Sequence, residues 1–246
     1  MELEVYQIFL VGIITVFASY IQSVTGFGSG IFAMIFLPSV LLYTEANVLS
    51  SILSMLISGI VMLVTFRKVH WKNLIFPLIG CLFATYIAVT FIQSQATETV
   101  TLLLGILLLA LSVYFYFFSE KIKIRPTWYT GLIAGILSGL MEGMFSIGGP
   151  PVVIYFLQSE EDSEQYLATI SAYFVFSGLI SVGTKAAAGF ITLNVWICLA
   201  VGILGMLVGS FVGKRTREQI RPALIKKAVY CVMAISGIVN IVTALI

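Results

Sequence analysis

The sequence predicts an all-α integral membrane protein made of two inverted repeats, each a glycine-broken helix pair followed by three transmembrane helices. Of the 246 residues, 60% are hydrophobic and only 10% are charged, whereas soluble domains average about 25% charged residues. Apolar runs long enough to cross a bilayer recur along the whole chain. Two shorter runs follow glycine-rich breaks at matching places in the two halves. The alternating pattern of a β-barrel is missing from the sequence.

The apolar runs divide the chain into its expected helices. They cover residues 5–22, 31–43, 47–66, 73–92, 99–118, 128–146, 150–157, 166–184, 191–212 and 226–246. The runs at 31–43 and 150–157 are too short to cross a hydrocarbon core of about 30 Å, so we expect them to be half-helices. The first run follows no basic leader and precedes no small-residue cleavage site, which favours a retained span over a signal peptide.

The two halves repeat the same order of elements. When the chain is shifted onto itself by 119 residues, Ser19 falls on Ser138 and Gly30 on Gly149. A shift of 121 residues places Asn73 on Asn194. Internal repeats of this kind are common in transporters. We therefore expect a single membrane domain that consists of an N-terminal repeat, 1–120, and a C-terminal repeat, 121–246.

Basic residues set the expected orientation of the repeats. Twelve of the 13 Lys and Arg residues lie in three loops: Arg67, Lys68 and Lys72; Lys121, Lys123 and Arg125; and Lys214, Arg215, Arg217, Arg221, Lys226 and Lys227. Cytoplasmic loops carry such an excess. All three loops share one side only when each broken segment enters and leaves the membrane on the same side. We therefore favour hairpins over full crossings, which makes the repeats inverted and leaves both termini outside.

The second break, Ser146-Ile147-Gly148-Gly149-Pro150-Pro151, interrupts a long apolar segment. Glycine permits backbone angles that other residues avoid, and proline suits the first position of a new helix. Irregular backbone at membrane depth is tolerated only inside protein or beside a watery cavity. The break is therefore a candidate binding site, and the alternative is a packing kink.

Polar groups at the two breaks form the candidate site. Half-helices that begin near Gly30 and Pro150 would direct free N–H groups and positive dipole ends into one central region, which suits a small anion. The expected substrate-binding residues are Gln22, Ser23, Thr25, Gly28, Ser29, Gly30, Ser146, Gly148, Gly149 and Pro150.

Two ionisable residues in apolar runs need an interpretation. Glu142 is the only acid clearly inside a span, and an ionised residue there is costly. Its carboxylate either couples protons or gates the substrate, or it is a protonated structural acid bonded to the broken backbone. Lys185 ends a span, and we expect its side chain to snorkel to the interface rather than to bind substrate.

Other motifs limit the function classes. HExxH, GxSxG and Walker motifs are missing from the sequence, so neither an enzyme nor ATP hydrolysis is expected. The cysteines Cys81, Cys198 and Cys231 lie in apolar spans and are expected to be core residues rather than metal ligands. We expect no cofactor, no metal and no nucleic acid; the expected partners are a small anion and the lipid bilayer. Two four-residue glycine ridges predict close helix contacts: Gly131, Gly135, Gly139 and Gly143, and Gly205, Gly209 and Gly213.

The stretches 23–30 (SVTGFGSG) and 143–150 (GMFSIGGP) resemble the duplicated glycine motifs of the TauE/SafE sulfite-exporter family, and the resemblance covers nearly the whole chain. The family pattern has three glycines and a later proline. Here Gly28-Ser29-Gly30 precedes Pro38, and Gly148-Gly149 is followed at once by Pro150-Pro151. The resemblance implies export of a small sulfur-containing or organic anion, such as sulfite or a sulfonate, across the cytoplasmic membrane without ATP.

Two other function classes stay open at this point. One is an anion or proton channel without alternating access. The other is a membrane-embedded enzyme or a partner subunit, although the sequence offers no nucleophile–base pair. The sequence does not indicate the exact substrate, the direction of transport, the coupling ion or the oligomeric state.

Overall fold

In the structure, a computed structural model, every regular element among the described residues is a helix. The described residues are 4–25, 28–117, 124–216 and 222–245, with the side chains of 25 and 222–226 left undescribed. The helices of the first half are α1 (Val5–Thr25), α2 (Ser29–Phe36), α3 (Tyr43–Thr65), α4 (Trp71–Gln93) and α5 (Thr97–Phe117). Those of the second half are α6 (Trp128–Phe145), α7 (Gly149–Ser159), α8 (Ser163–Ala187), α9 (Leu193–Thr216) and α10 (Pro222–Leu245). Each expected apolar run overlaps one of these helices, but the run 31–43 extends past the end of α2 through a 3₁₀ helix, Leu37–Ser39.

Local sequence signals place several helix ends. Thr127 is the N-cap residue of α6 and forms a capping box with Thr130. Asp162 begins α8, where its carboxylate accepts hydrogen bonds of 2.8 Å from the N–H groups of Glu164 and Gln165. Such caps satisfy N–H groups that have no partner inside the helix.

Seven of the described helices, α1, α3, α4, α5, α8, α9 and α10, are long and apolar enough to span a membrane. The 18-residue α6 and the shorter α2 and α7 are not among them. Large apolar side chains such as Phe83 and Leu204, each 65% exposed, cover the outside of the bundle. Such a surface is suited to lipid, since water-soluble proteins avoid large exposed apolar patches.

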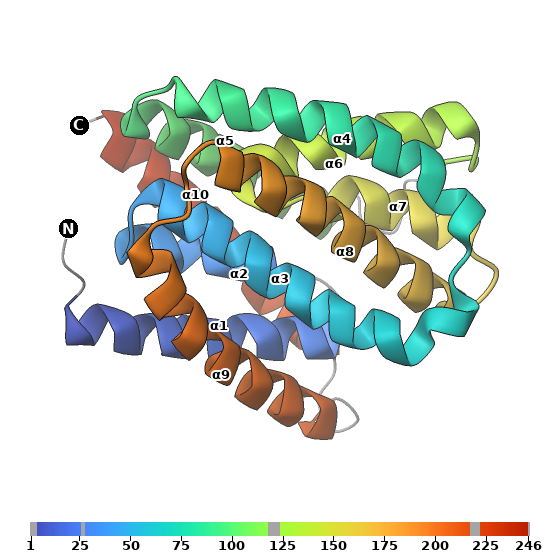
Figure 1. Cartoon of the computed structure of the whole chain (residues 1–246), viewed down its shortest axis with the longest axis horizontal. Coiled ribbons are helices and arrows are strands. Elements are labelled where there is room, and N and C mark those ends of the chain that lie inside the picture. Colours follow the sequence, from blue (N-terminus) through green and yellow to red (C-terminus); the bar gives the residue numbers. More distant parts are fainter. Residues whose placement is uncertain (1–3, 26–27, 118–123, 217–221, 246) are drawn as a thin grey trace.

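The two broken segments form hairpins that enter the bundle from opposite ends (Figure 1). In Figure 1, α1 runs inward from the left-hand end and α2 returns toward that end. Helix α6 runs inward from the right-hand end, and α7 returns toward it. The two helices of each hairpin pack against each other. The turn at Gly26 and Phe27 lies outside the described residues. Each short helix thus begins deep in the protein and ends near the surface.

Helices of one half pack mainly against helices of the other half. Helix α4 lies along α6, α1 lies along α9, α3 packs on α8 at the centre, and α5 packs on α10. The glycine ridges make two of these contacts. A Cβ atom on Gly139 would lie 2.6 Å from the carbonyl oxygen of Cys81, and one on Gly209 would overlap the carbonyl oxygen of Val16. The close contacts predicted from the ridges are therefore confirmed.

Glu45 corrects the expectation that Glu142 is the only acid inside a span. Glu45 lies in the first turn of α3, with 2% of its surface exposed. Its Oε1 atom accepts hydrogen bonds from Thr192 Oγ1 at 2.6 Å and from Asn194 Nδ2 at 3.1 Å. These partners, at the start of α9, satisfy the buried carboxylate. The apolar run of the sequence begins only at residue 47, so the sequence alone does not place Glu45 inside a span.

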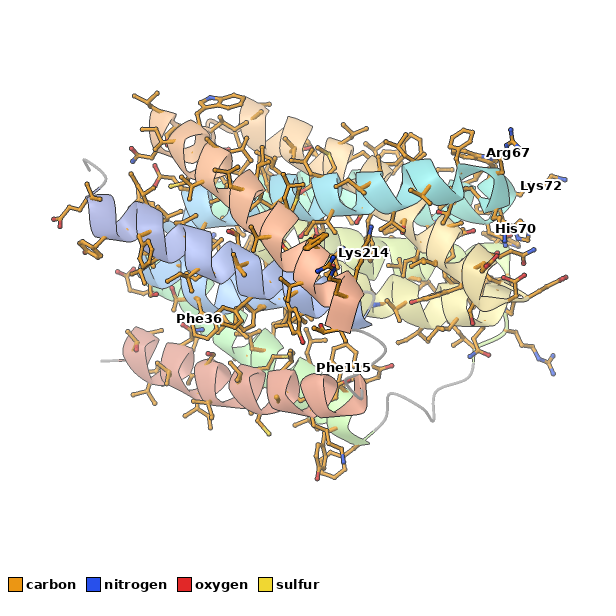
Figure 2. The ribbon with its side chains drawn as sticks, turned by 90° about the horizontal axis from the view of Figure 1, so that it is seen from below. Phe36, Arg67, His70, Lys72, Phe115 and Lys214 are labelled. Atoms are coloured by element: carbon orange, nitrogen blue, oxygen red, sulfur yellow. The ribbon has the colours of Figure 1, made fainter. Side chains whose placement is uncertain are left out.

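A second buried carboxylate makes the corresponding contact at the other end of the molecule. Glu160, between α7 and α8, accepts a hydrogen bond of 2.9 Å from Asn73 Nδ2 and lies 2.7 Å from His70 Nδ1. Asn73 lies in the first turn of α4, as Asn194 lies in the first turn of α9. Figure 2 shows His70 beside Arg67 at this end. Glu45, in the first turn of α3, and Glu160, in the loop after α7, therefore each join one half of the chain to the other.

The cysteines correct a further expectation. Cys81 and Cys198 are buried, as expected for core residues, but Cys231 is exposed. Cys231 lies on α10, which is in contact with the rest of the protein mainly through α5. A helix at the edge of the bundle turns part of its apolar surface to lipid, so an apolar span does not by itself make each of its residues a core residue.

Candidate functional site

The two broken segments meet inside the bundle. Gly30, in the first turn of α2, lies against the carbonyl oxygen of Ser146 at the end of α6, and a Cβ atom on Gly30 would overlap that oxygen. Gly28 precedes α2 with a φ of 101°, in the left-handed region that favours glycine. Glycine is thus required at Gly28 by backbone conformation and at Gly30 by close approach of the other half.

A cavity of about 50 Å³ lies where the hairpins meet. It has room for several waters or a small anion, since one water needs only about 10–15 Å³ on this measure. Helices α1, α2, α3, α6, α7 and α8 all contribute to its wall. The lining residues are Gln22, Gly28, Ser29, Gly30, Ile31, Ser51, Ser54, Met55, Ser58, Glu142, Ser146, Ile147, Gly148, Gly149, Pro150, Phe174, Ser177 and Gly178.

Most of the expected site residues lie together around this cavity. These are Gln22, Gly28, Ser29, Gly30, Glu142, Ser146, Gly148, Gly149 and Pro150. Ser23 is not among the lining residues: it lies in the contact between α1 and α9, where a Cβ atom on Gly213 would be 2.6 Å from Ser23 Cβ. The side chain of Thr25 lies outside the described residues. Ser23 lies on the face of α1 that contacts α9, so its side chain does not reach the cavity.

The wall also contains serines that the sequence analysis did not select. Ser51, Ser54 and Ser58 lie on one face of α3, at the three- and four-residue spacing that aligns side chains along a helix. Ser54 Oγ lies 3.0 Å from Ser29 Oγ, and Gln22 Nε2 donates to Ser58 Oγ at 3.5 Å. A polar stripe in an otherwise apolar span was the available signal for these residues.

The N-terminus of α2 lies at the wall of the cavity. Its first hydrogen bond runs from the N–H of Phe32 to the carbonyl of Gly28 at 3.0 Å. The N–H groups of Ser29, Gly30 and Ile31 precede this bond and have no acceptor within the helix. All three residues line the cavity. Backbone donors at a helix N-terminus, with the positive end of the helix dipole, favour a bound anion.

The N-terminus of α7 differs because the protein itself supplies an acceptor there. Glu142 Oε2 accepts a hydrogen bond of 3.2 Å from the N–H of Gly148, and Oε1 accepts one of 2.8 Å from Ser51 Oγ. Pro150 and Pro151 have no N–H to donate. Helix α7 therefore has fewer backbone N–H groups available to a ligand than α2. The sequence did not indicate this difference, because the two breaks occupy matching positions in the two halves.

Lys185 corrects the expectation that its side chain snorkels to the interface. The residue is completely buried. Its Nζ donates to Ser51 Oγ at 2.7 Å, Ser146 Oγ at 2.9 Å and the carbonyl of Glu142 at 3.0 Å. These bonds use all three N–H donors of the ammonium, and the carbonyl belongs to the negative end of α6. The ammonium turns inward because the broken end of α6 supplies acceptors there.

Ser146 ends α6 in a conformation that is uncommon for serine. Its φ is 55° and its ψ is 32°, in the left-handed region. Its N–H donates to the carbonyl of Glu142 at 3.0 Å. Its Oγ accepts from Lys185 and donates to the carbonyl oxygen of Asn47 at 2.7 Å or to Asn47 Oδ1 at 2.8 Å. Contacts from α3 and α8 thus hold the strained residue in place.

Comparison with known protein families identifies the group to which this fold belongs. The model of the family described as "Sulfite exporter TauE/SafE" matches residues 11–239. The chain belongs to the TauE/SafE sulfite exporter family. It is similar to the protein from Cupriavidus necator named "Probable sulfite/organosulfonate exporter TauE", with 22% identity over 220 residues, 87% of this chain and 86% of the relative. No solved structure matches the chain. This is a family of membrane transporters and not of enzymes, as the sequence predicted.

Proposed function

We propose that this TauE/SafE protein is a secondary transporter, working as an exporter, that moves a small sulfur-containing or organic anion such as sulfite or a short sulfonate. The observation that carries the proposal is the cavity between the two broken segments, lined by serines and by the first residues of α2, whose N–H groups have no acceptor within the helix. Its size suits a small oxyanion. The name of the relative from Cupriavidus necator supports the same substrate class for this chain.

The proposed site uses donors from α2 and α3. The N–H groups of Ser29, Gly30 and Ile31 would hold the oxyanion, and the hydroxyls of Ser54 and Ser58 would complete its hydrogen bonding. Oxygen atoms of a sulfite or sulfonate accept several such bonds at once. Because the donors are backbone groups and neutral side chains, binding would be weak enough to permit release on the other side of the membrane.

Alternating access between the two halves is proposed in preference to a channel. The pairing of α4 with α6 corresponds to that of α9 with α1, and α3–α8 and α5–α10 each pair equivalent helices. This pattern supports two repeats, 1–120 and 121–246, related by a pseudo-two-fold axis in the membrane plane. Transporters with inverted repeats carry their substrate site at the interface of the repeats and expose it to each side in turn.

An anion titration of the purified protein tests the substrate class. Sulfite and methanesulfonate should raise the melting temperature in a concentration-dependent way, whereas choline should not. A ligand at 100 times its dissociation constant adds about 2.7 kcal/mol to the stability of the folded state. In proteoliposomes, unlabelled anion on the far side should accelerate uptake of labelled anion, which a channel cannot do.

Matched variants locate the anion. Ser54→Ala should weaken anion binding roughly two- to tenfold, which corresponds to one hydrogen bond of about 0.5–1.5 kcal/mol. Thr90→Ala is the control, because Thr90 is exposed and its hydroxyl bonds only to carbonyl groups of its own helix. Equal affinity in both variants would place the anion elsewhere, and no stabilisation by either anion would reject the substrate class.

A further inference from the structure

The negative charge of Glu142 in the cavity wall would oppose an anionic ligand unless a nearby positive charge compensates it. Among the described residues that line the cavity, Glu142 alone has an ionisable side chain. An ionised carboxylate there would repel an anion, and in a partly desolvated site this repulsion is screened far less than in water. Lys185 does not line the cavity, but its ammonium lies directly behind the wall formed by Ser51 and Ser146.

Ser51 links the two charged groups. Its Oγ accepts from Lys185 Nζ at 2.7 Å and donates to Glu142 Oε1 at 2.8 Å. An ionised carboxylate can only accept a hydrogen bond, so the Ser51 hydroxyl donates its hydrogen to Glu142 and accepts from the ammonium. The described residues contain no direct contact of 4 Å or less between the ammonium and the carboxylate, so the hydroxyl is the bridge. Lys185 is completely buried and Glu142 is half-buried at the cavity wall, so each charge is partly or fully desolvated and is stabilised by the other.

We infer that Lys185 and Glu142 form one charge-compensated unit, bridged by Ser51, and that Lys185 is the positioning residue that allows the cavity to accept an anion. This inference rests on the proposed function. Lys185 neutralises the wall and, through Ser51, keeps the Glu142 carboxylate on the Gly148 N–H at the start of α7. The donors of α2 then remain available to the substrate. Without Lys185, the wall has one uncompensated negative charge.

A purely structural role for Lys185 gives a different expectation. The ammonium also donates to the Glu142 carbonyl at the end of α6, so it could serve only as a cap for that helix. If Lys185 only caps α6, Lys185→Met loses that cap whether residue 142 is Glu or Gln, so the double variant should be as impaired as the single one. A charge-compensated unit is restored when both charges are removed, because Glu142→Gln is isosteric and leaves the wall neutral.

The test compares the wild type with Lys185→Met, Glu142→Gln and the double variant, using sulfite and methanesulfonate as probes. Lys185→Met should weaken binding of both anions by roughly tenfold or more, the scale of one uncompensated charge in a partly desolvated site. The double variant should regain most of the affinity. Lys214→Met, which removes an exposed charge at the end of α9, is the control and should bind like the wild type. Equal impairment of Lys185→Met and the double variant would overturn the inference.

Melting temperatures without ligand provide a second readout. If the two charges compensate each other, the double variant should lose less stability than the sum of the losses in the two single variants. Losses that simply add would contradict the inference. If Lys185→Met does not fold, a folded double variant that binds anion supports the inference, and an unfolded one overturns it. If the wild type binds neither anion, the proposed function fails, and the stability comparison alone decides whether the two charges act together.

Discussion

Beyond its own helix, Glu142 contacts three different parts of the chain. Its carboxylate accepts from Ser51 on α3 and from the N–H of Gly148 before α7, while its carbonyl accepts from Lys185 on α8. A change in the protonation of this single group would alter the hydrogen bonding of α3 and of the break between α6 and α7 together. This arrangement is suited to coupling substrate release to proton transfer, because the carboxylate lies in the cavity that we propose as the anion site.

Glu142→Gln tests this coupling. If Glu142 takes up a proton during the transport cycle, the wild-type rate depends on pH, and the glutamine variant, which imitates the protonated acid, should bind the anion but lose that dependence. The measurement is anion uptake into proteoliposomes across a pH series. Glu98→Gln, in the first turn of α5 and exposed, should keep the wild-type profile. Full activity with an unchanged profile would leave Glu142 a structural acid.

At the scale of single residues, the sequence indicated the groups whose chemistry is local. Gly28 and Gly30 stood out because a glycine-rich run interrupts a helix, and Glu142 because an acid in an apolar span is costly. Lys185 was misplaced because a lysine near the end of a span can turn either way. Its direction depends on acceptors supplied by Ser51 and by α6, which are distant in sequence.

At the scale of helices, glycine faces determine how closely neighbours approach. Along α9, Gly205 lies against the backbone of α1 at Gly12, and Gly209 against the backbone at Val16. Along α6, Gly135 lies against the backbone of α4 at Pro77. Glycine spacing predicted these faces correctly, because spacing along a helix is a local property. It could not name the partner helix, since that choice depends on how the two halves come together.

Gly209→Ala should destabilise the protein by about 1–3 kcal/mol, because the added methyl group forces α1 and α9 apart. Gly183→Ala is the matched control: Gly183 is also helical, and a Cβ atom there would meet no atom within 4 Å. The control should match or slightly exceed the wild type, since alanine is the better helix former. The comparison uses melting temperatures in detergent, and equal values for both variants would contradict close packing between α1 and α9.

At the scale of the whole molecule, the two halves contribute to one site and do not form separate domains. The hairpin α1–α2 meets the break between α6 and α7, and the carboxylates of Glu45 and Glu160 each join one half to the other. The order of elements in the sequence predicts two repeats, because a duplicated order survives even where few residues are identical, and this stays a prediction. The exchange of contacts between halves, α4 with α6 and α1 with α9, follows from packing in three dimensions and has no counterpart in the linear sequence.

Cysteine labelling tests the inverted arrangement. Cys81 and Cys198 are buried and Cys231 is exposed, so all three are first replaced to remove background labelling. Arg67→Cys, Arg125→Cys and Lys214→Cys should then react with a membrane-impermeant reagent from the cytoplasmic side, because hairpins in both halves place the three basic loops together. Gln95→Cys, in the loop between α4 and α5, should react from the opposite side. Labelling of Arg67→Cys and Lys214→Cys from different sides would mean that one broken segment crosses the membrane, and the two halves could not then be inverted repeats.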